Sequence, residues 1–293
     1  MKKLWFLSIS ALAIAVSALL IQLQVSNTSV ETITFFPLND AVKYKSASTS
    51  LSLLKDKKNN QHQVDWKVHS SLDQEAYLRQ DMGLLFVNGL LKGKFAKWEQ
   101  DTSDLSQEEI ISYGESARYD AISFHYAELH GGGDRITSAQ TMSDDMIYVI
   151  DSPFSPLQSF TIAKSNQEQE WKKVLDQSVK NRLEQSLKNA EKTFRFNASN
   201  YISIPLDKIR IYEDQPIPGF TKKETANILG RLWEGLYKNY YLGIKKSDGT
   251  AVDPIGSTMP LILVARDKSH LLVVTQTRSG ESIILKQLLQ DSN

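Results

Sequence analysis

The chain has 293 residues, of which 41% are hydrophobic and 23% are charged, and its 34 basic residues balance its 34 acidic ones. This composition excludes a largely disordered protein. The zero net charge provides no broad basic surface, so we expect no nucleic-acid partner.

The N-terminus has the pattern of an export signal, because Lys2 and Lys3 precede an uncharged, apolar run over residues 4–21. The run is longer than the apolar part of a cleaved signal, about 7–15 residues, and close to the roughly 20 residues of a membrane helix. The small-residue tripeptides that would suit cleavage, at 13–15 and 16–18, lie inside the run. Residues 1–25 are therefore predicted to be a signal anchor that contacts the membrane through residues 4–21, with a cleaved signal peptide as the alternative.

The paired lysines indicate a cytoplasmic N-terminus, which leaves the C-terminal part extracytoplasmic in a single-pass membrane protein. Cleavage would instead give a secreted protein. The chain contains no cysteine, which excludes lipid attachment at a cysteine, disulfides, thiolate metal ligands and a cysteine nucleophile. An exported chain without cysteine is typical of a bacterial envelope that does not rely on disulfides.

Residues 26–63 are predicted to be a polar spacer with one short strand at residues 31–38. Residues 64–151 are expected to be mainly β. Asn88-Gly89 stands between two apolar runs, and this pair favours the positive φ angles of a type I′ hairpin turn. Further strands are predicted at 64–68, 117–130, 135–141 and 146–151.

A change of hydrophobic period follows the Ser- and Pro-containing segment 152–156, where we place a candidate domain boundary. Residues 167–194 and 221–241 have the three-to-four-residue spacing of amphipathic helices. Thr221 and Glu224 match a capping box. Strands are expected at residues 201–212 and in a C-terminal meander over 261–265, 271–275 and 283–289.

These elements predict an α+β fold, preceded by an N-terminal membrane helix. It would combine antiparallel sheets, in a hairpin-rich N-terminal half and a C-terminal three-stranded meander, with two long amphipathic helices on one side. Residues 152–293 would form a helix–strand–helix–meander region, and whether they share a domain with residues 64–151 is left open.

One dense cluster of titratable residues, His125, Glu128, His130 and Asp134, is a candidate metal site. Alternation along a strand places Glu128 and His130 on one face and His125 on the other. A mixed-face strand before a glycine turn is the alternative interpretation. Residues 130–133 spell HGGG, but no G-x-S-x-G motif accompanies them, and no phosphate-loop or dinucleotide motif is present.

The sequence therefore assigns no catalytic residue, no ligand-binding residue and no cofactor. It favours a membrane-anchored, non-catalytic binding or regulatory module of the cell envelope, with an envelope protein as a possible partner and an unknown small-molecule ligand. The alternative is a secreted or wall-associated hydrolase that could use a metal at the His125 cluster.

Overall fold

The computed structural model describes residues 36–54, 58, 60–131, 135–245 and 249–289. Thr34–Asn293 forms one compact unit, to which the following description applies. The predicted anchor and most of the strand expected at 31–38 lie outside the described residues. Within the described ranges, no helix is both long and apolar enough to cross a membrane.

A very long hairpin forms the centre of the first half of this unit. Strands β2 (His62–Val87) and β3 (Leu90–Tyr113) pair antiparallel. Asn88 and Gly89 connect them with φ angles of 50° and 76°, which confirms the predicted hairpin turn and its physical reason. The register shifts between Ser71 and Ala76, and such an irregularity lets a strand bend.

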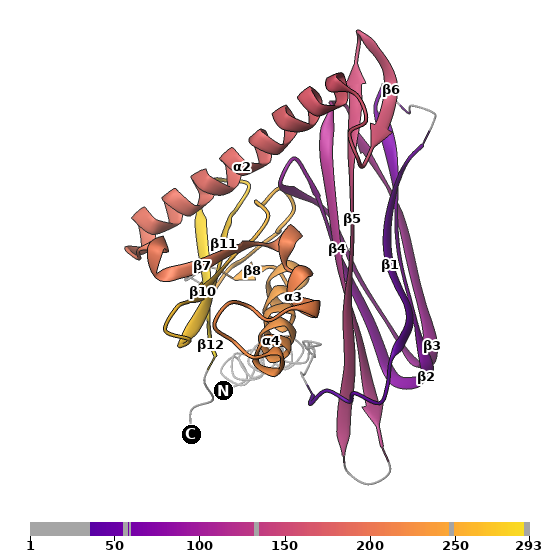
Figure 1. Cartoon of the computed structure of the whole chain (residues 1–293), viewed down its shortest axis with the longest axis vertical. Coiled ribbons are helices and arrows are strands. Elements are labelled where there is room, and N and C mark those ends of the chain that lie inside the picture. Colours follow the sequence, from indigo (N-terminus) through magenta and orange to yellow (C-terminus); the bar gives the residue numbers. More distant parts are fainter. Residues whose placement is uncertain (1–35, 55–57, 59, 132–134, 246–248, 290–293) are drawn as a thin grey trace, which may run out of the picture. The chain divides into compact units, whose positions relative to one another are not determined.

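The bend allows one edge of β2 to hold two different strands. β1 (Tyr44–Leu53) pairs with its first half, and β4 (Ala117–His130) pairs with its second half. β5 (Ile136–Ser152) follows on β4, and β6 (Ser155–Phe160) on β5. The six-stranded sheet thus has the order β1-β2-β4-β5-β6, with β3 on the far edge of β2 (Figure 1).

Strand β1 also lies against β5, so the sheet curls into a nearly closed, barrel-like form. Thr49 Oγ1 lies 2.7 Å from Ser143 Oγ, and the Leu51 amide donates to Asp145 Oδ2 at 2.7 Å. Residues 44–53 lie within the predicted polar spacer, and the structure shows that they form a strand there, β1. Their polar residues alternate with the buried Thr49 and Leu51, so the polarity belongs to the outer face of a strand.

Trp66 fills the interior of the barrel. Its side chain is fully buried, and its ring stacks on Phe95 with 4.0 Å between centroids. A Cβ atom added at Gly83 would lie 2.7 Å from Trp66 Cζ2, and one at Gly93 would lie 2.9 Å from Cζ3. The two glycines therefore make the space that the indole occupies, and the two halves of the bent hairpin close on it.

The second half of the unit begins with α2 (Asn166–Phe194), which starts at a capping box of Ser165 and Glu168. The remaining larger elements are β7 (Tyr201–Pro205), the single-turn α3 (Ile211–Asp214), α4 (Lys222–Tyr240), β10 (Leu261–Ala265), β11 (His270–Gln276) and β12 (Ser282–Leu288). Four short elements complete it: η1 (Ala198–Asn200), η2 (Leu206–Lys208) and the paired strands β8 (Ile244–Lys245) and β9 (Ala251–Val252). β7 joins the predicted meander in a four-stranded antiparallel sheet, β12-β11-β10-β7.

The α+β prediction was wrong, because antiparallel sheet dominates the described residues and most of it belongs to the barrel-like sheet. Only three α-helices occur in the described part of the chain, and one of them is the four-residue α3. The length of β2 and β3 explains the difference, because both strands continue through polar stretches that face solvent. The strand predicted over 201–212 was also too long, since it stops at Pro205 and continues as η2 and α3.

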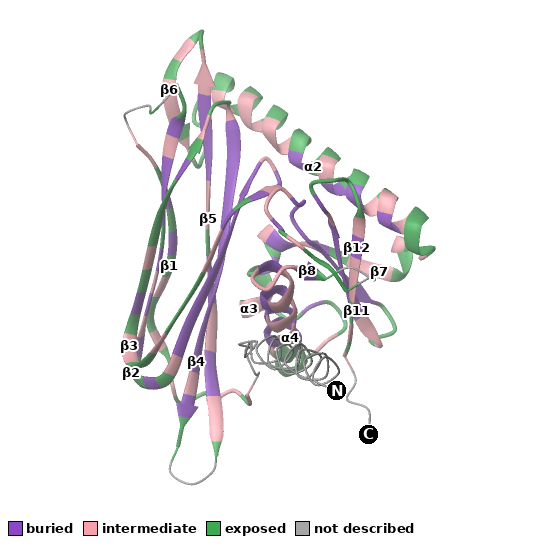
Figure 2. Cartoon of the chain, turned by 180° about the vertical axis from the view of Figure 1, so that it is seen from behind, coloured by how far each residue is buried: buried purple, intermediate pink, exposed green. Residues whose placement is uncertain are grey.

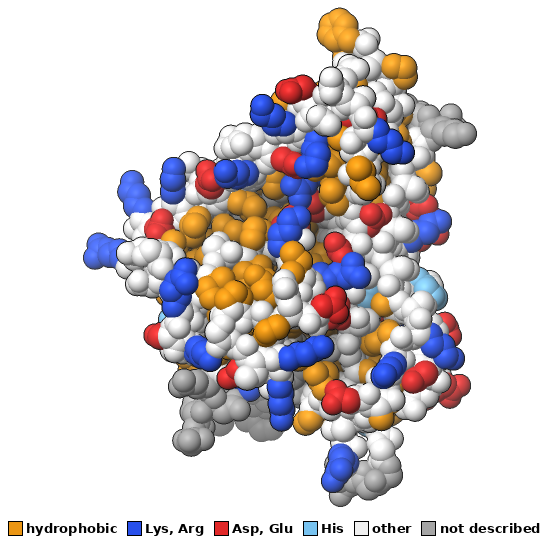
Figure 3. Space-filling model, viewed as in Figure 1, with side chains coloured by type: hydrophobic (Ala, Val, Ile, Leu, Met, Phe, Trp, Pro, Cys, Tyr) orange, Lys and Arg blue, Asp and Glu red, His pale blue; other side chains and the backbone are white. Residues whose placement is uncertain are grey.

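Arg118 on β4 ties the barrel to the second half. Its guanidinium lies 2.6 Å from Asp120, 3.1 Å from Asp176 on α2 and 2.7 Å from Asp207 on η2. Helix α2 is buried along one side and exposed along the other (Figure 2). Beneath it, hydrophobic side chains gather towards the four-stranded sheet (Figure 3), where Leu183 and Leu187 line a shallow groove. The segment 152–156, proposed above as a boundary, is the turn between the paired strands β5 and β6.

Candidate functional site

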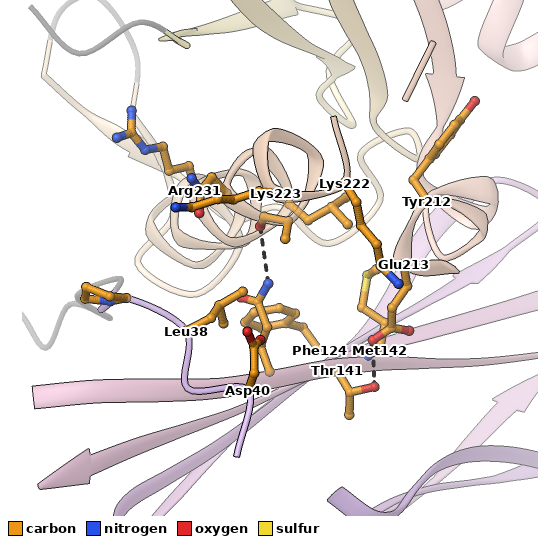
Figure 4. Close-up of a pocket in the computed structure, with 15 residues that line it drawn as sticks. Leu38, Asp40, Phe124, Thr141, Met142, Tyr212, Glu213, Lys222, Lys223 and Arg231 are labelled. Carbon is orange, nitrogen blue, oxygen red and sulfur yellow. Dashed lines mark hydrogen bonds between the residues drawn. The ribbon is translucent and has the colours of Figure 1, made fainter. Parts of the chain in front are cut away.

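A cavity of about 910 Å³ lies between the barrel-like sheet and helix α4. Its walls come from four separate parts of the chain: the segment before β1, strands β4 and β5, helix α3 and helix α4 (Figure 4). Its lining includes the apolar residues Leu38, Phe124 and Met142 and the charged residues Asp40, Glu213, Lys222, Lys223 and Arg231. A volume of this order is sufficient for a small organic ligand.

The apolar wall of the cavity is held rigidly. Phe124 on β4 stacks on Trp233 of α4, with 5.3 Å between ring centroids. The Trp233 Nε1–H group points at the Met142 sulfur, which lies 3.3 Å away. Aromatic stacking and sulfur contacts of this kind orient side chains as well as burying them. The wall is therefore preformed, with Phe124 and Met142 almost fully buried in it.

Cationic side chains lie at the start of α4, on the other side of the cavity. The capping box of Thr221 and Glu224 sets the first turn of the helix, as its sequence pattern predicted. This start places Lys222 and Lys223 at the cavity, where the positive end of the helix dipole adds to their charge. Neither lysine has an ion-pair partner among the described residues. The cavity therefore combines an apolar wall with lysines that form no ion pair among the described residues, although Asp40 and Glu213 also line it.

Glu213 of α3 lines the cavity and is hydrogen-bonded to strand β5. Its Oε1 atom accepts hydrogen bonds from Thr141 Oγ1 at 2.6 Å and from the Met142 amide at 2.9 Å. Burial raises the pKa of the Glu213 carboxyl, and these two hydrogen bonds oppose the shift. In Figure 4, Lys222 and Glu213 point toward one another across the cavity. The carboxyl is thus a polar anchor for α3 and a titratable group at the ligand cavity.

Replacing Glu213 by alanine is expected to destabilise the protein by about 1–3 kcal/mol, because two donors lose their acceptor. Glu213→Gln keeps an acceptor oxygen and should be far milder. The raised pKa has a defined consequence for pH dependence. In the wild type, the raised pKa of Glu213 adds to the free energy of unfolding. This stabilisation is fully present below the unfolded-state pKa and is lost as pH rises through the folded-state pKa.

Urea unfolding of the three proteins between pH 4 and pH 8 measures this contribution. The free energy of unfolding of the wild type minus that of Glu213→Gln should decrease as the pH rises. A difference that does not change with pH, or that changes in the opposite direction, would contradict the assignment.

The structure separates the members of the sequence-predicted metal cluster. His125 is buried inside the barrel, where it contacts Asp81 and Ser143. Glu128 and His130 contact each other on the outer face, and the His130 ring stacks on Tyr77 at 3.8 Å. Asp134 lies outside the described residues. Among the described residues, no three His, Asp or Glu side chains converge in a way that could hold a metal ion.

His125 belongs to a buried network that resembles a nucleophilic triad in its connections. Its Nε2 atom lies 2.7 Å from Ser143 Oγ, and its Nδ1 atom lies 2.8 Å from Asp81 Oδ2. In serine hydrolases this relation activates the hydroxyl group. Here Ser143 also bonds to Thr49 of β1 and is 3% exposed, and neither Ser143 nor His125 lines a cavity described here. The network therefore connects β1 with β2, β4 and β5.

Sequence reasoning missed the residues of the cavity. Only the start of α4 had a local signal, the capping box. Phe124 was indistinguishable from other strand residues, Met142 fell between two predicted strands that the structure joins as β5, and Glu213 fell in a segment predicted to follow a strand. Comparison of the chain with models of known protein families, with curated proteins and with solved structures found no match.

Proposed function

We propose that the protein is a non-catalytic ligand-binding module of the cell envelope, and that its ligand is an amphipathic molecule with an anionic group. The observation that carries this proposal is the cavity between α4 and the sheet. The apolar tail would lie on Phe124 and Met142, and the anionic group would lie near Lys222 and Lys223. The lysines are long and flexible, so they select charge and not a particular head-group shape.

The placement of this module outside the membrane rests on the sequence of residues 1–25. The two lysines before an uncharged run support an anchor with its N-terminus in the cytoplasm. Release by cleavage would leave the binding site unchanged, so the ligand proposal does not depend on the choice between anchor and signal peptide.

Methionine methyl NMR of the full chain tests the proposal, with decanoate as the probe. All three methionines are buried, but Met142 lines the cavity, whereas Met82 and Met259 do not. Decanoate below its micellar concentration should shift the Met142 methyl signal saturably and leave Met82 and Met259 unchanged. Decanol, which lacks the charge, should bind more weakly.

Charge removal provides the matched control. Lys222→Gln combined with Lys223→Gln should weaken decanoate binding about tenfold, which corresponds to about 1.4 kcal/mol. Lys173→Gln combined with Lys188→Gln removes the same charge from the exposed side of α2 and should leave binding unchanged. An unshifted Met142 signal, or equal shifts at all three methionines, would refute binding in this cavity.

A further inference from the structure

A second cavity, of about 730 Å³, lies between α2 and the loops at one end of the four-stranded sheet. Its lining comes from α2, the start of β3, the loop before β10 and the β11–β12 turn. The lining residues with polar side chains are Lys92, Ser178, Asn181, Arg182, Gln185, Thr258, Gln276, Thr277 and Arg278. This cavity shares no lining residue with the one beneath α4.

The charge of this cavity is entirely positive. Lys92, Arg182 and Arg278 line it, and no aspartate or glutamate does. Neither arginine has an ion-pair partner among the described residues. The Arg182 Nε atom is buried and has no hydrogen-bond partner among the described residues. A buried donor of a charged group is costly to leave unsatisfied, so this atom points to a missing acceptor.

Both arginine stems are fixed by glycines in the left-handed backbone region. A Cβ atom at Gly89, where φ is 76°, would lie 3.6 Å from Arg182 Cδ. At Gly256, where φ is 86°, it would lie 3.1 Å from Arg278 Cδ. Part of each stem therefore lies on a turn of the backbone, which limits the directions in which the guanidinium groups can point.

Lys92 contributes charge at a greater distance. Its ammonium lies 5.1 Å from the centroid of the Tyr113 ring, a cation–π arrangement that turns it towards the barrel. The polar side chains of Asn181, Gln185 and Gln276 supply uncharged donors and acceptors around the arginines. Two guanidinium groups with such neighbours suit an oxyanion, because the planar guanidinium donates two parallel hydrogen bonds to phosphate.

We propose that this second cavity binds a phosphate group, carried by a small molecule or present as free phosphate, through Arg182 and Arg278. The site is independent of the ligand proposed for the cavity beneath α4. Its formation requires α2 and the β11–β12 turn to lie together, so binding should also stabilise the docking of α2.

Calorimetric titration of the full chain with inorganic phosphate and with glycerol 1-phosphate tests the site, with glycerol as the uncharged control. Both anions should bind saturably to one site, and glycerol should not bind. Tighter binding of glycerol 1-phosphate would identify a phosphate ester as the ligand, whereas equal binding would identify the free ion.

Arg182→Gln and Arg278→Gln should each weaken binding about tenfold or more, the loss typical of a charge-assisted hydrogen bond. Lys188→Gln, an exposed change on the same helix α2, should have no effect. Thermal unfolding of each variant shows whether it has folded, and Arg278 lies on an exposed turn where substitution should be tolerated. Absence of saturable binding to the wild type, or an equal loss in Lys188→Gln, would overturn the proposal.

Discussion

Replacing Trp66 by alanine is expected to destabilise the folded protein by about 3–5 kcal/mol, the usual cost of deleting a large buried aromatic side chain. Trp66 is fully buried and stacks on Phe95 at 4.0 Å. It also lies on Gly83 and Gly93 from the opposite part of the bent hairpin, so its loss would leave a cavity that the backbone of a curled sheet cannot readily close. Guanidinium unfolding followed by far-UV circular dichroism measures the change.

The glycines give this prediction a sharper form. Gly83→Ala should destabilise the wild type by about 1–3 kcal/mol through overpacking, because the new Cβ atom would lie 2.7 Å from Trp66. In a Trp66→Leu background the same substitution should cost much less, since the clashing ring is absent. Gly235→Ala on α4 is the control, because no neighbouring atom lies within 4 Å of its added Cβ. Additive effects of the two core substitutions would contradict the packing described here.

Asp81→Ala is expected to cost about 3–5 kcal/mol, because it would strip a buried arginine of its counter-charge. Arg79 and Asp81 are both fully buried, and Arg79 Nη2 lies 4.0 Å from Asp81 Oδ1. Ser70 joins them by donating to Asp81 Oδ2 at 2.6 Å and by accepting from Arg79. His125 would lose its carboxylate partner at the same time.

A double substitution separates the cost of an unpaired charge from the net value of the pair. Arg79→Met combined with Asp81→Leu removes both charges, and such replacements are often close to neutral. We expect the double variant to be more stable than Asp81→Ala in denaturant unfolding. An Asp81→Ala variant within about 1 kcal/mol of the wild type would show that the network is not important for stability.

Elements that depend on neighbouring residues were predictable from the sequence. Asn88-Gly89 specifies its turn through backbone preferences of two adjacent residues, and Thr221 with Glu224 specifies the start of α4 through hydrogen bonds within four residues. The predicted long strand at 117–130 coincides with β4, and the residues that favour a strand lie in its middle part, at Tyr119, Ile122, Phe124 and Tyr126.

Contacts between distant segments were not predictable in this way. The polar residues of 44–53 looked like a spacer because a strand with one solvated face carries few apolar residues. Only its partners on β2 and β5 show that it belongs to a barrel. Among the candidate metal ligands, the sequence correctly placed His125 opposite Glu128 and His130, but it could not show that His125 faces Asp81 across the sheet. That metal site stays a prediction, since Asp134 lies outside the described residues.

The sequence by itself determined the balanced charge, the absence of cysteine chemistry, the principal hairpin and the capped start of α4. Each of these depends on composition or on residues close together in the chain. The tertiary structure decided the fold class and both cavities, because Trp66 meets Gly83, Glu213 meets Met142, and Arg182 meets Gly89 only after distant segments pair. Strand register and helix docking minimise the energy of the whole chain, and no local pattern encodes them.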